Sequence, residues 1–330
     1  MSRKATNKLL QKAKKSKSDE FYTQLCDIDS ELKHYKSHFK DKVVYCNCDD
    51  HKISNFFKYF YDNFESLGIK RLIASCYKDQ DDTLLNKNGE KGFFIDYRGD
   101  KSNFSPQDFS YFDGDGDFRS TESIELLEQA DIVVTNPPFS LFREYIDQLV
   151  THDKKFLVIG NVNSITYKEI FKLIQEDKVW LGVNLGRGVS GFIVPEHYDL
   201  YGTEARVDEE GNRIVSPNNC LWLTNLDLLK RHEDIPLTKK YYGNESEYPA
   251  YDNYDGINVN KTKDIPLDYT GAMGVPITFL HKYNPEQFEI IKFRKGDDNK
   301  DLSINGKPPY FRILVKNKRL KMNEQMSLFN

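Results

Sequence analysis

The chain has 330 residues, which suits one large domain or two smaller ones. With 38% hydrophobic and 30% charged residues it is expected to be a soluble globular protein, because no run approaches the roughly 18 apolar residues of a membrane span. The net charge of -4 is an average over an uneven distribution of charge. Residues 1–18 contain seven Lys or Arg and no acidic residue, and residues 292–321 contain ten Lys or Arg and three Asp.

The N-terminus and the cysteines indicate a cellular compartment. The basic start has no apolar stretch behind it, so we predict no secretory signal and a cytoplasmic protein. The five cysteines are odd in number and lack C-x-x-C spacing. We therefore predict free thiols, with neither a disulfide framework nor a bound metal.

Short apolar runs alternate with amphipathic stretches along most of the chain. The predicted strands are 42–46, 70–77, 130–136, 155–161, 179–184, 191–195 and 219–225. The predicted helices are 54–64, 121–129, 140–150 and 166–177. This order predicts an α/β fold with a doubly wound, mostly parallel sheet, and the later strands, with fewer helices between them, should be antiparallel.

Two later features suggest binding. Residues 239–260 contain five tyrosines with few aliphatic side chains, which predicts a long functional loop or an ordered surface excursion without a ligand. The separated basic stretches suit a polyanion, although a solvated tail and a soluble edge strand would also explain them.

Three segments are expected to face one crevice. In a doubly wound sheet, ligands bind outside the carboxyl ends of the strands. The segments NCDD (47–50) and NPPF (136–139) each follow a predicted strand, and GDGDF (114–118) precedes the strand at 130–136. We therefore predict a ligand site between them.

The NPPF turn carries the chemistry. Consecutive prolines hold the backbone extended and provide no N–H, which leaves a rigid pair of acceptors, the side-chain oxygen of Asn136 and the backbone oxygen of Pro137. Two fixed acceptors suit an amino group with two hydrogens, and they stabilise the charge that develops as its nitrogen attacks a methyl group. Phe139 offers a flat face beside them. The alternative is a rigid strand-to-helix turn without catalytic function.

The motif resembles the D/N-P-P-Y/F signature of amino-group methyltransferases that use S-adenosylmethionine. The chain as a whole resembles the EcoRI-type adenine-N6 DNA methyltransferases in segments that cover nearly its full length. Among these segments are DEFYT, DKVVYCNCDD, SNFFKYF, GDGDFRS, DIVVTNPPFSLFREY, LGRGVSGFIVPEHY and INVNKTKDIPLDY.

The resemblance implies a Rossmann-like methyltransferase fold and three regions: a basic DNA-binding arm at 1–18, a catalytic domain at 19–235, and a target-recognition region at 236–330. It implies that the catalytic turn consists of Asn136, Pro137, Pro138 and Phe139, and that the cofactor is bound by Phe21, Tyr22, Thr23, Asp49, Asp50, Asp117 and Phe118. The expected phosphate-binding residues are Arg3, Lys4, Lys8, Lys12, Lys14, Lys15 and Lys17.

The chain departs from the family pattern at the cofactor. No G-x-G follows the first strand, so side chains should make more of the contacts than glycine backbone would. No acidic residue directly follows the second strand, where Ser75 and Cys76 stand. The ribose contact is therefore not assigned.

The implied reaction is methylation of adenine N6 in double-stranded DNA, in the sequence GAATTC, by a monomer that protects DNA from a restriction endonuclease. The adenine would leave the duplex and stack on Phe139, with Phe192 as a second face. Alternatives are an RNA or protein-glutamine methyltransferase, and a non-catalytic DNA-binding protein on the same fold.

Overall fold

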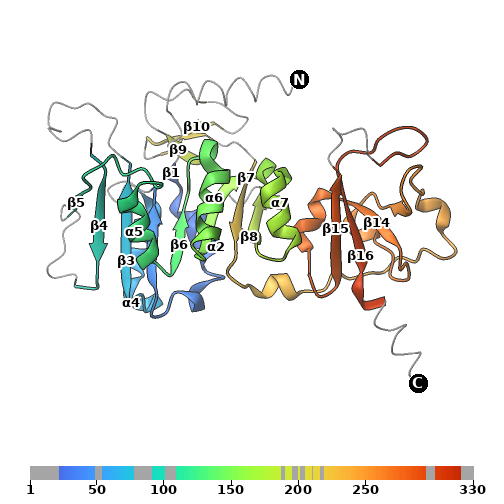
Figure 1. Ribbon diagram of the computed structural model, residues 1–330, viewed down its shortest axis with the longest axis horizontal. Coiled ribbons are helices and arrows are strands. Elements are labelled where there is room, and N and C mark those ends of the chain that lie inside the picture. The colour runs from blue at the N-terminus through green and yellow to red at the C-terminus, as the bar shows by residue number, and fades with distance from the viewer. Residues whose placement is uncertain are drawn as a thin grey trace. The chain divides into compact units, whose positions relative to one another are not determined.

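The structure is a computed structural model of the chain (Figure 1). It describes residues 22–48, 54–77, 91–100, 109–186, 190–194, 200, 205–209, 211–215, 219–294 and 302–320. The chain forms two compact units, of which unit 1 comprises 1–164 and 181–226, and unit 2 comprises 165–180 and 227–330. In the described residues, no helix is both long and apolar enough to cross a membrane.

A mostly parallel sheet forms the centre of unit 1. Its strands in spatial order are β5 (Ser110–Tyr111), β4 (Phe93–Tyr97), β3 (Arg71–Cys76), β2 (Val43–Asn47), β6 (Ile132–Thr135), β7 (Lys155–Asn161), β12 (Cys220–Thr224) and β8 (Trp180–Gly186). The pairs β3–β2, β2–β6 and β6–β7 are parallel, whereas β4 and β12 pair antiparallel to β3 and β7. The predicted α/β class and the antiparallel later strand agree with this sheet.

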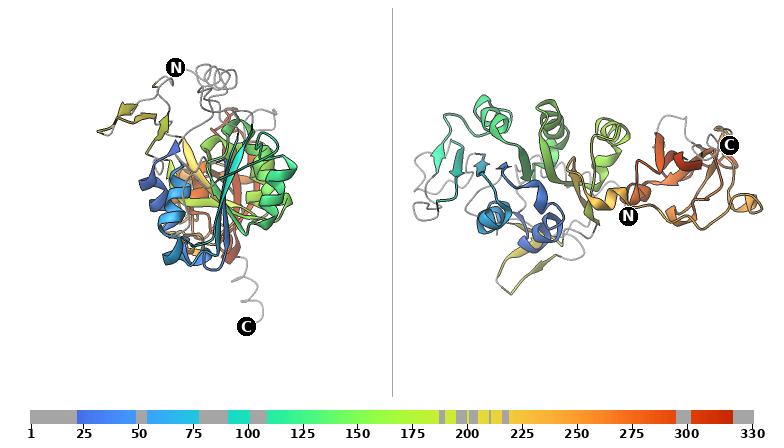
Figure 2. Two further views of the ribbon diagram at one scale, coloured as in Figure 1. Left: turned by 90° about the vertical axis from the view of Figure 1, so that its left-hand side faces the viewer. Right: turned by 90° about the horizontal axis from the view of Figure 1, so that it is seen from below.

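Helices cover both faces of the sheet, as Figure 2 shows with α5 (Thr121–Gln129) and α6 (Phe142–Thr151) on one side and α2 (Leu25–Leu32) and α3 (Asn55–Asp62) on the other. Burial on two faces explains why β2, β6 and β12 are apolar without alternation. The short α4 (Phe64–Leu67) follows α3 and ends at Gly68, whose φ is 64°.

The sequence was less informative at three places in unit 1. The predicted strand at 191–195 is β9 (Phe192–Val194), which lies in a separate small sheet in the order β1 (Tyr22–Thr23), β9, β11 (Arg213–Val215) and β10 (Arg206–Val207). The strand β4 and the helix α2 were not predicted. Helix α2 buries Asp27 and Glu31, and these charges obscure its apolar face in the sequence.

Unit 2 contains α7 (Lys168–Gln175) and a sheet in the order β13 (Gly256–Asn258), β14 (Ala272–Pro276), β16 (Arg312–Asn317) and β15 (Phe288–Arg294). Short 3-10 turns connect its strands, at Leu229–His232, Glu245–Glu247, Thr262–Asp264 and Ile277–Lys282. Gln175 ties α7 to this sheet, because its side-chain amide donates to the carbonyl of Ile291 over 2.7 Å. The segment 239–260, predicted as a loop, is irregular apart from the turn at Glu245–Glu247 and β13.

Candidate active site

The NPPF turn lies where β6 ends and α6 begins. Pro138 is extended, with φ -56° and ψ 120°, and a 3-10 turn (Phe139–Leu141) then leads into α6. Asn136 is half-buried and its Oδ1 atom is buried. The carbonyl of Pro138, which is not one of the two predicted acceptors, accepts a hydrogen bond from the backbone N–H of Leu141 over 3.0 Å. This bond closes the turn that leads into α6.

Asn47, the last residue of β2, joins the two neighbouring strand ends. Its backbone oxygen accepts a hydrogen bond from the hydroxyl of Thr135, the residue before Asn136. Its side-chain oxygen accepts another from the hydroxyl of Tyr145 on α6. All three groups are buried, so these bonds are shielded from water and hold the end of β2 against the start of the NPPF turn and α6.

Cys48 follows Asn47 with φ 64°, in the left-handed region that glycine adopts most easily. The family pattern has glycines at this loop, and the sequence here has none. The backbone at Cys48 nevertheless has a glycine-like conformation, which a non-glycine residue adopts at a cost of about 1 kcal/mol. The departure from the glycine pattern therefore changes side chains at this position without abolishing the turn.

The acidic loop before α5 approaches the same strand ends. Gly116 has φ 75°, and a β-carbon there would lie 2.6 Å from the carbonyl oxygen of Cys76 at the end of β3, so only glycine fits. Phe118 is buried, and its ring meets that of Tyr145 edge-on with centroids 5.2 Å apart. Gln148 on α6 donates to the carbonyl of Phe118 over 2.9 Å. The loop is thus fixed to α6 and β3 together.

Asp117 is an ionised carboxylate in this loop. Arg119 donates from Nε to Oδ1 over 2.9 Å and from a terminal nitrogen to Oδ2 over 2.7 Å, and this pairing lowers the pKa of Asp117 below its usual range. The same arginine also reaches Glu144 over 2.9 Å. A ligand amino group that binds Asp117 would therefore share the carboxylate with Arg119.

The segment that contains Tyr22 and Thr23 forms β1, in which Thr23 pairs with Phe192. The backbone oxygen of Thr23 accepts a hydrogen bond from Asn55, at the start of α3, over 2.8 Å. Only 3% of Thr23 is exposed, and its hydroxyl has no hydrogen-bond partner among the residues that the structure describes. A buried hydroxyl of this kind suits a polar group of a ligand.

Phe139 and Phe192, the two predicted stacking rings, lie close together. Their centroids are 6.2 Å apart and their planes cross at 75°. Phe139 is half-buried whereas Phe192 is fully buried within β9. Rings that meet edge-on do not enclose a flat base between parallel faces, so Phe192 is better explained as part of the core.

Several predicted residues lie outside the described part of the chain. They are Phe21, Asp49, Asp50 and the basic residues Arg3, Lys4, Lys8, Lys12, Lys14, Lys15 and Lys17. The structure brings together Asn136, Phe139, Asp117, Phe118 and Thr23 through their elements. Sequence reasoning placed Asn47 in the NCDD segment of the predicted crevice without giving it a role, and it missed Tyr145, which no local signal indicated.

Comparison with known proteins adds to this geometry. The family model described as "Adenine-specific methyltransferase EcoRI" matches residues 9–318. The type II methyltransferase M.EcoRI of Escherichia coli is 72% identical over 325 residues, which are 97% of this chain and 100% of that protein. Type II methyltransferases of Mycoplasma genitalium and Mycoplasma pneumoniae are each 36% identical, over 94% and 93% of this chain and 98% of their own lengths. No solved structure matches the chain.

Proposed function

Because the chain belongs to the EcoRI-type family of adenine-specific DNA methyltransferases, we propose that Asn136 and Pro137 hold the amino group that it methylates. The chain is a type II enzyme of the restriction-modification class, and S-adenosylmethionine is its methyl donor. The sequence had also allowed an RNA or protein-glutamine methyltransferase and a non-catalytic DNA-binding protein. Membership of this family favours the adenine-specific DNA methyltransferase over these alternatives. The main support for this site is that Asn136 directly follows β6, at the carboxyl end of a central strand.

The side-chain oxygen of Asn136 and the backbone oxygen of Pro137 accept the two N–H bonds of adenine N6. These bonds favour the tetrahedral nitrogen that would form as N6 bonds to the methyl carbon while the carbon–sulfur bond breaks and its electron pair stays on sulfur; N6 would then release one proton to water. The donor, when bound, supplies a methyl group on a positively charged sulfur. Rigid acceptors contribute mainly by orientation, since prolines fix the backbone before the substrate arrives.

Residues around the strand ends would hold the donor. The hydroxyl of Thr23 is buried with an unused hydrogen-bonding capacity among the described residues, which fits a polar group of the cofactor. Asp117 keeps its negative charge beside Arg119 and would accept from the amino group of the cofactor adenine. Phe118 supplies apolar surface next to it. Tyr22, Phe21, Asp49 and Asp50 complete the set that we propose for the cofactor.

The target adenine must leave the duplex, at a cost of a few kcal/mol. Stacking on an aromatic ring is worth about 1 to 3 kcal/mol per base and offsets part of this cost. We assign this role to Phe139, which follows the acceptors directly and is half-buried. Pro138 sets the direction in which Phe139 leaves the turn.

We further propose that the target is GAATTC and that a cognate restriction endonuclease shares it without needing to bind this protein. The basic arm at 1–18 would bind phosphates, the region 19–235 would perform the chemistry, and the region 236–330 would recognise the target. The protein would act as a monomer in the cytoplasm, where its DNA lies.

Replacement of Asn136 by alanine tests the site. We expect the rate of methyl transfer to a duplex that contains GAATTC to fall by about 10²- to 10³-fold, as for the loss of one charge-stabilising group. The dissociation constant for S-adenosylmethionine, measured by calorimetry, should stay within twofold. Undiminished transfer in Asn136→Ala would refute the proposed acceptor, and a duplex without GAATTC is the control for the target.

A further inference from the structure

The tyrosine-rich segment at 239–260 turns two of its five tyrosines into the interior of unit 2. Tyr248 and Tyr251 are buried, and their hydroxyls donate to the carbonyl of Asp264 and to the side chain of Asn258, each over 3.0 Å. Tyr241 packs against Tyr248, with ring centroids 5.8 Å apart. Tyr248 and Tyr251 are therefore not available to a partner, and an aromatic DNA contact of this unit needs a more exposed ring.

Tyr310 differs from these tyrosines, because 68% of it is exposed although one face of its ring is packed. Its centroid lies 4.5 Å from that of Phe311, at an interplanar angle of 30°. Phe311 contacts Phe293 at 6.1 Å, and Phe293 stacks on Phe171 of α7 at 4.9 Å. The exposed ring is thus the outer end of a row of aromatic rings that leads into the unit.

The backbone that carries Tyr310 is held from both sides. Two prolines precede it, and they restrict the chain before the ring. The guanidinium of Arg312 donates to the carbonyl of Tyr310 over 2.7 Å and to the side chain of Asn258 over 2.9 Å. Because the backbone already holds the ring, the ring loses little conformational freedom on binding, which favours affinity for a partner.

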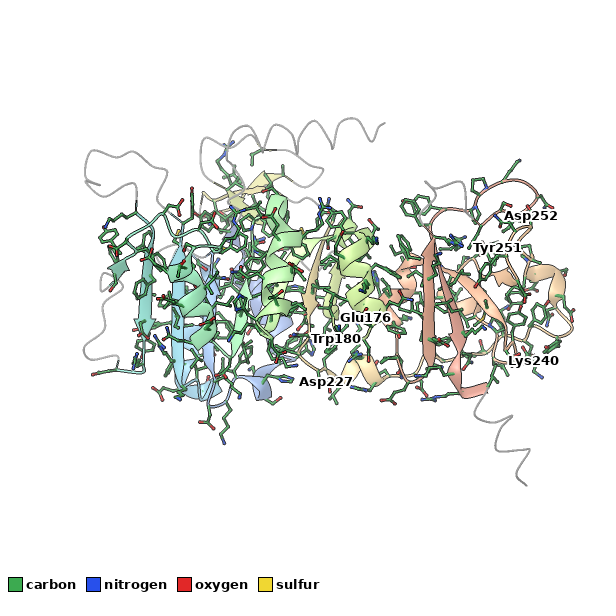
Figure 3. The ribbon with its side chains drawn as sticks, viewed as in Figure 1. Glu176, Trp180, Asp227, Lys240, Tyr251 and Asp252 are labelled. Carbon is green, nitrogen blue, oxygen red and sulfur yellow. The ribbon has the colours of Figure 1, made fainter. Side chains whose placement is uncertain are left out.

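Asp252 fixes the turn that leads to this segment. Its carboxylate accepts from the backbone N–H of Gly306 over 2.8 Å, from that of Asn305 over 3.1 Å, and from the hydroxyl of Ser303 over 2.9 Å. Figure 3 shows Asp252 and Tyr251 together beside the connection that precedes β16. The negative charge of Asp252 is used in these three bonds, which lower the pKa of the carboxyl.

The charge around Tyr310 suits a polyanion. Lys307 and Arg312 flank Tyr310 in the chain, and the described residues 302–320 contain no acidic residue. Lys318 and Arg319 follow the other end of β16, where Arg319 pairs with Asp234. Tyr242, which is 62% exposed, has a mixed setting, since Glu245 and Glu247 follow the lysines that precede it. In Figure 3, Lys240 lies below Asp252 on the same side of the view. The two exposed tyrosines therefore differ in the charges that flank them in the chain.

From this geometry we infer that the segment 306–312 is a contact for duplex DNA, in which the Tyr310 ring enters a groove against base edges and sugars. The ammonium of Lys307, three residues earlier, binds a backbone phosphate. This inference rests on the proposed function, since it assumes a DNA substrate, and it names one surface within the region 236–330.

The test is Tyr310→Ala in the full-length chain. The dissociation constant for a duplex that contains GAATTC, and the KM for that duplex, should rise about tenfold, because an aromatic contact with a base is worth roughly 1 to 3 kcal/mol. The value of kcat at saturating DNA and the affinity for S-adenosylmethionine should remain unchanged. Tyr310→Phe should bind nearly as the natural protein does, since it keeps the ring.

Tyr242→Ala is the matched control, because it removes a similarly exposed tyrosine that has acidic as well as basic neighbours in the chain, and its DNA affinity should change less than twofold. Lys307→Gln should weaken binding and lower the slope of log K against log salt by about one. Unchanged DNA affinity in Tyr310→Ala, or an equal loss in Tyr242→Ala, would overturn the inference. Failure of the natural protein to methylate duplex DNA would instead refute the proposed function.

Discussion

The strand ends of unit 1 and the tyrosine-rich segment of unit 2 use polar and aromatic residues in opposite ways. In unit 1, the carboxyl ends of β2 and β6 meet where Asn47 bonds Thr135 and Tyr145, and the candidate residue Asn136 directly follows Thr135. In unit 2, the long segment turns Tyr248 and Tyr251 inward. A concentration of reactive or aromatic residue types therefore locates a site only where the topology also brings strand ends together.

Tyr251→Ala should have the largest effect on this contrast. The side chain is buried, and its hydroxyl bonds Asn258, so we expect the free energy of unfolding to fall by about 3 kcal/mol or more. Urea denaturation would measure this change, with exposed Tyr242→Ala as the control at less than about 0.5 kcal/mol. Equal losses in the two variants would mean that the segment is not part of the core.

Glu31→Gln probes the polar interior of unit 1. The Glu31 carboxylate accepts from the backbone N–H groups of Val183 and Asn184, each over 2.7 Å, and from the hydroxyl of Tyr35 over 2.9 Å. Glutamine replaces one acceptor oxygen by a donor, so we expect a loss of about 1 to 3 kcal/mol in the free energy of unfolding.

This loss should depend on pH. Burial raises the pKa of Glu31 above its ordinary value of 4.5. The folded protein therefore holds a proton that the unfolded chain releases, and the natural protein loses stability as pH rises from 4.5 through the raised pKa. The difference between the natural protein and Glu31→Gln should shrink over that window in urea denaturation. Parallel stability curves would show that Glu31 does not titrate there.

Thr23→Val tests whether a buried hydroxyl of unit 1 binds the cofactor, and it has the smallest expected effect. Valine keeps the shape but removes the buried hydroxyl, and one hydrogen bond is worth about 1 kcal/mol, so the dissociation constant for S-adenosylmethionine should rise about fivefold. Calorimetry would measure it, and Thr23→Ser should retain most of the affinity. If Thr23→Val binds the cofactor as tightly as the natural protein, the hydroxyl is not a ligand.

Hydrophobic pattern was a reliable guide in unit 1 because each central strand is buried on both faces and each helix has one apolar face. Helix α5 occupies the residues predicted for it, since Ser120 caps it by accepting from the backbone N–H of Ser123. The NPPF turn was visible because proline restricts the backbone in any context. Helix α2 was missed because its buried face carries Asp27 and Glu31, which only the tertiary fold satisfies.

The site was predictable where a local rule decides the geometry and unpredictable where distant residues meet. The bond between Tyr145 and Asn47 joins residues 98 positions apart, and no pattern in the sequence encodes that pairing. Likewise, the tyrosines of 239–260 have the composition of a binding loop, but their burial depends on packing against the sheet of unit 2. Tyr310 attracted no attention in the sequence because a single tyrosine has no periodicity.

The carboxylate of Glu31 also has a consequence for how molecules of this protein meet one another. Strand β8 is the last strand of its sheet, and an outermost strand with open amide groups invites a strand of another molecule to pair with it. Gly182 leaves room for the approach of Glu31, because a β-carbon there would lie 2.3 Å from its oxygen. Because the amides of Val183 and Asn184 already donate to the Glu31 carboxylate, these two groups are not open to a strand of another molecule. The two bonds that attach α2 to β8 thereby also make this border less open to strand addition.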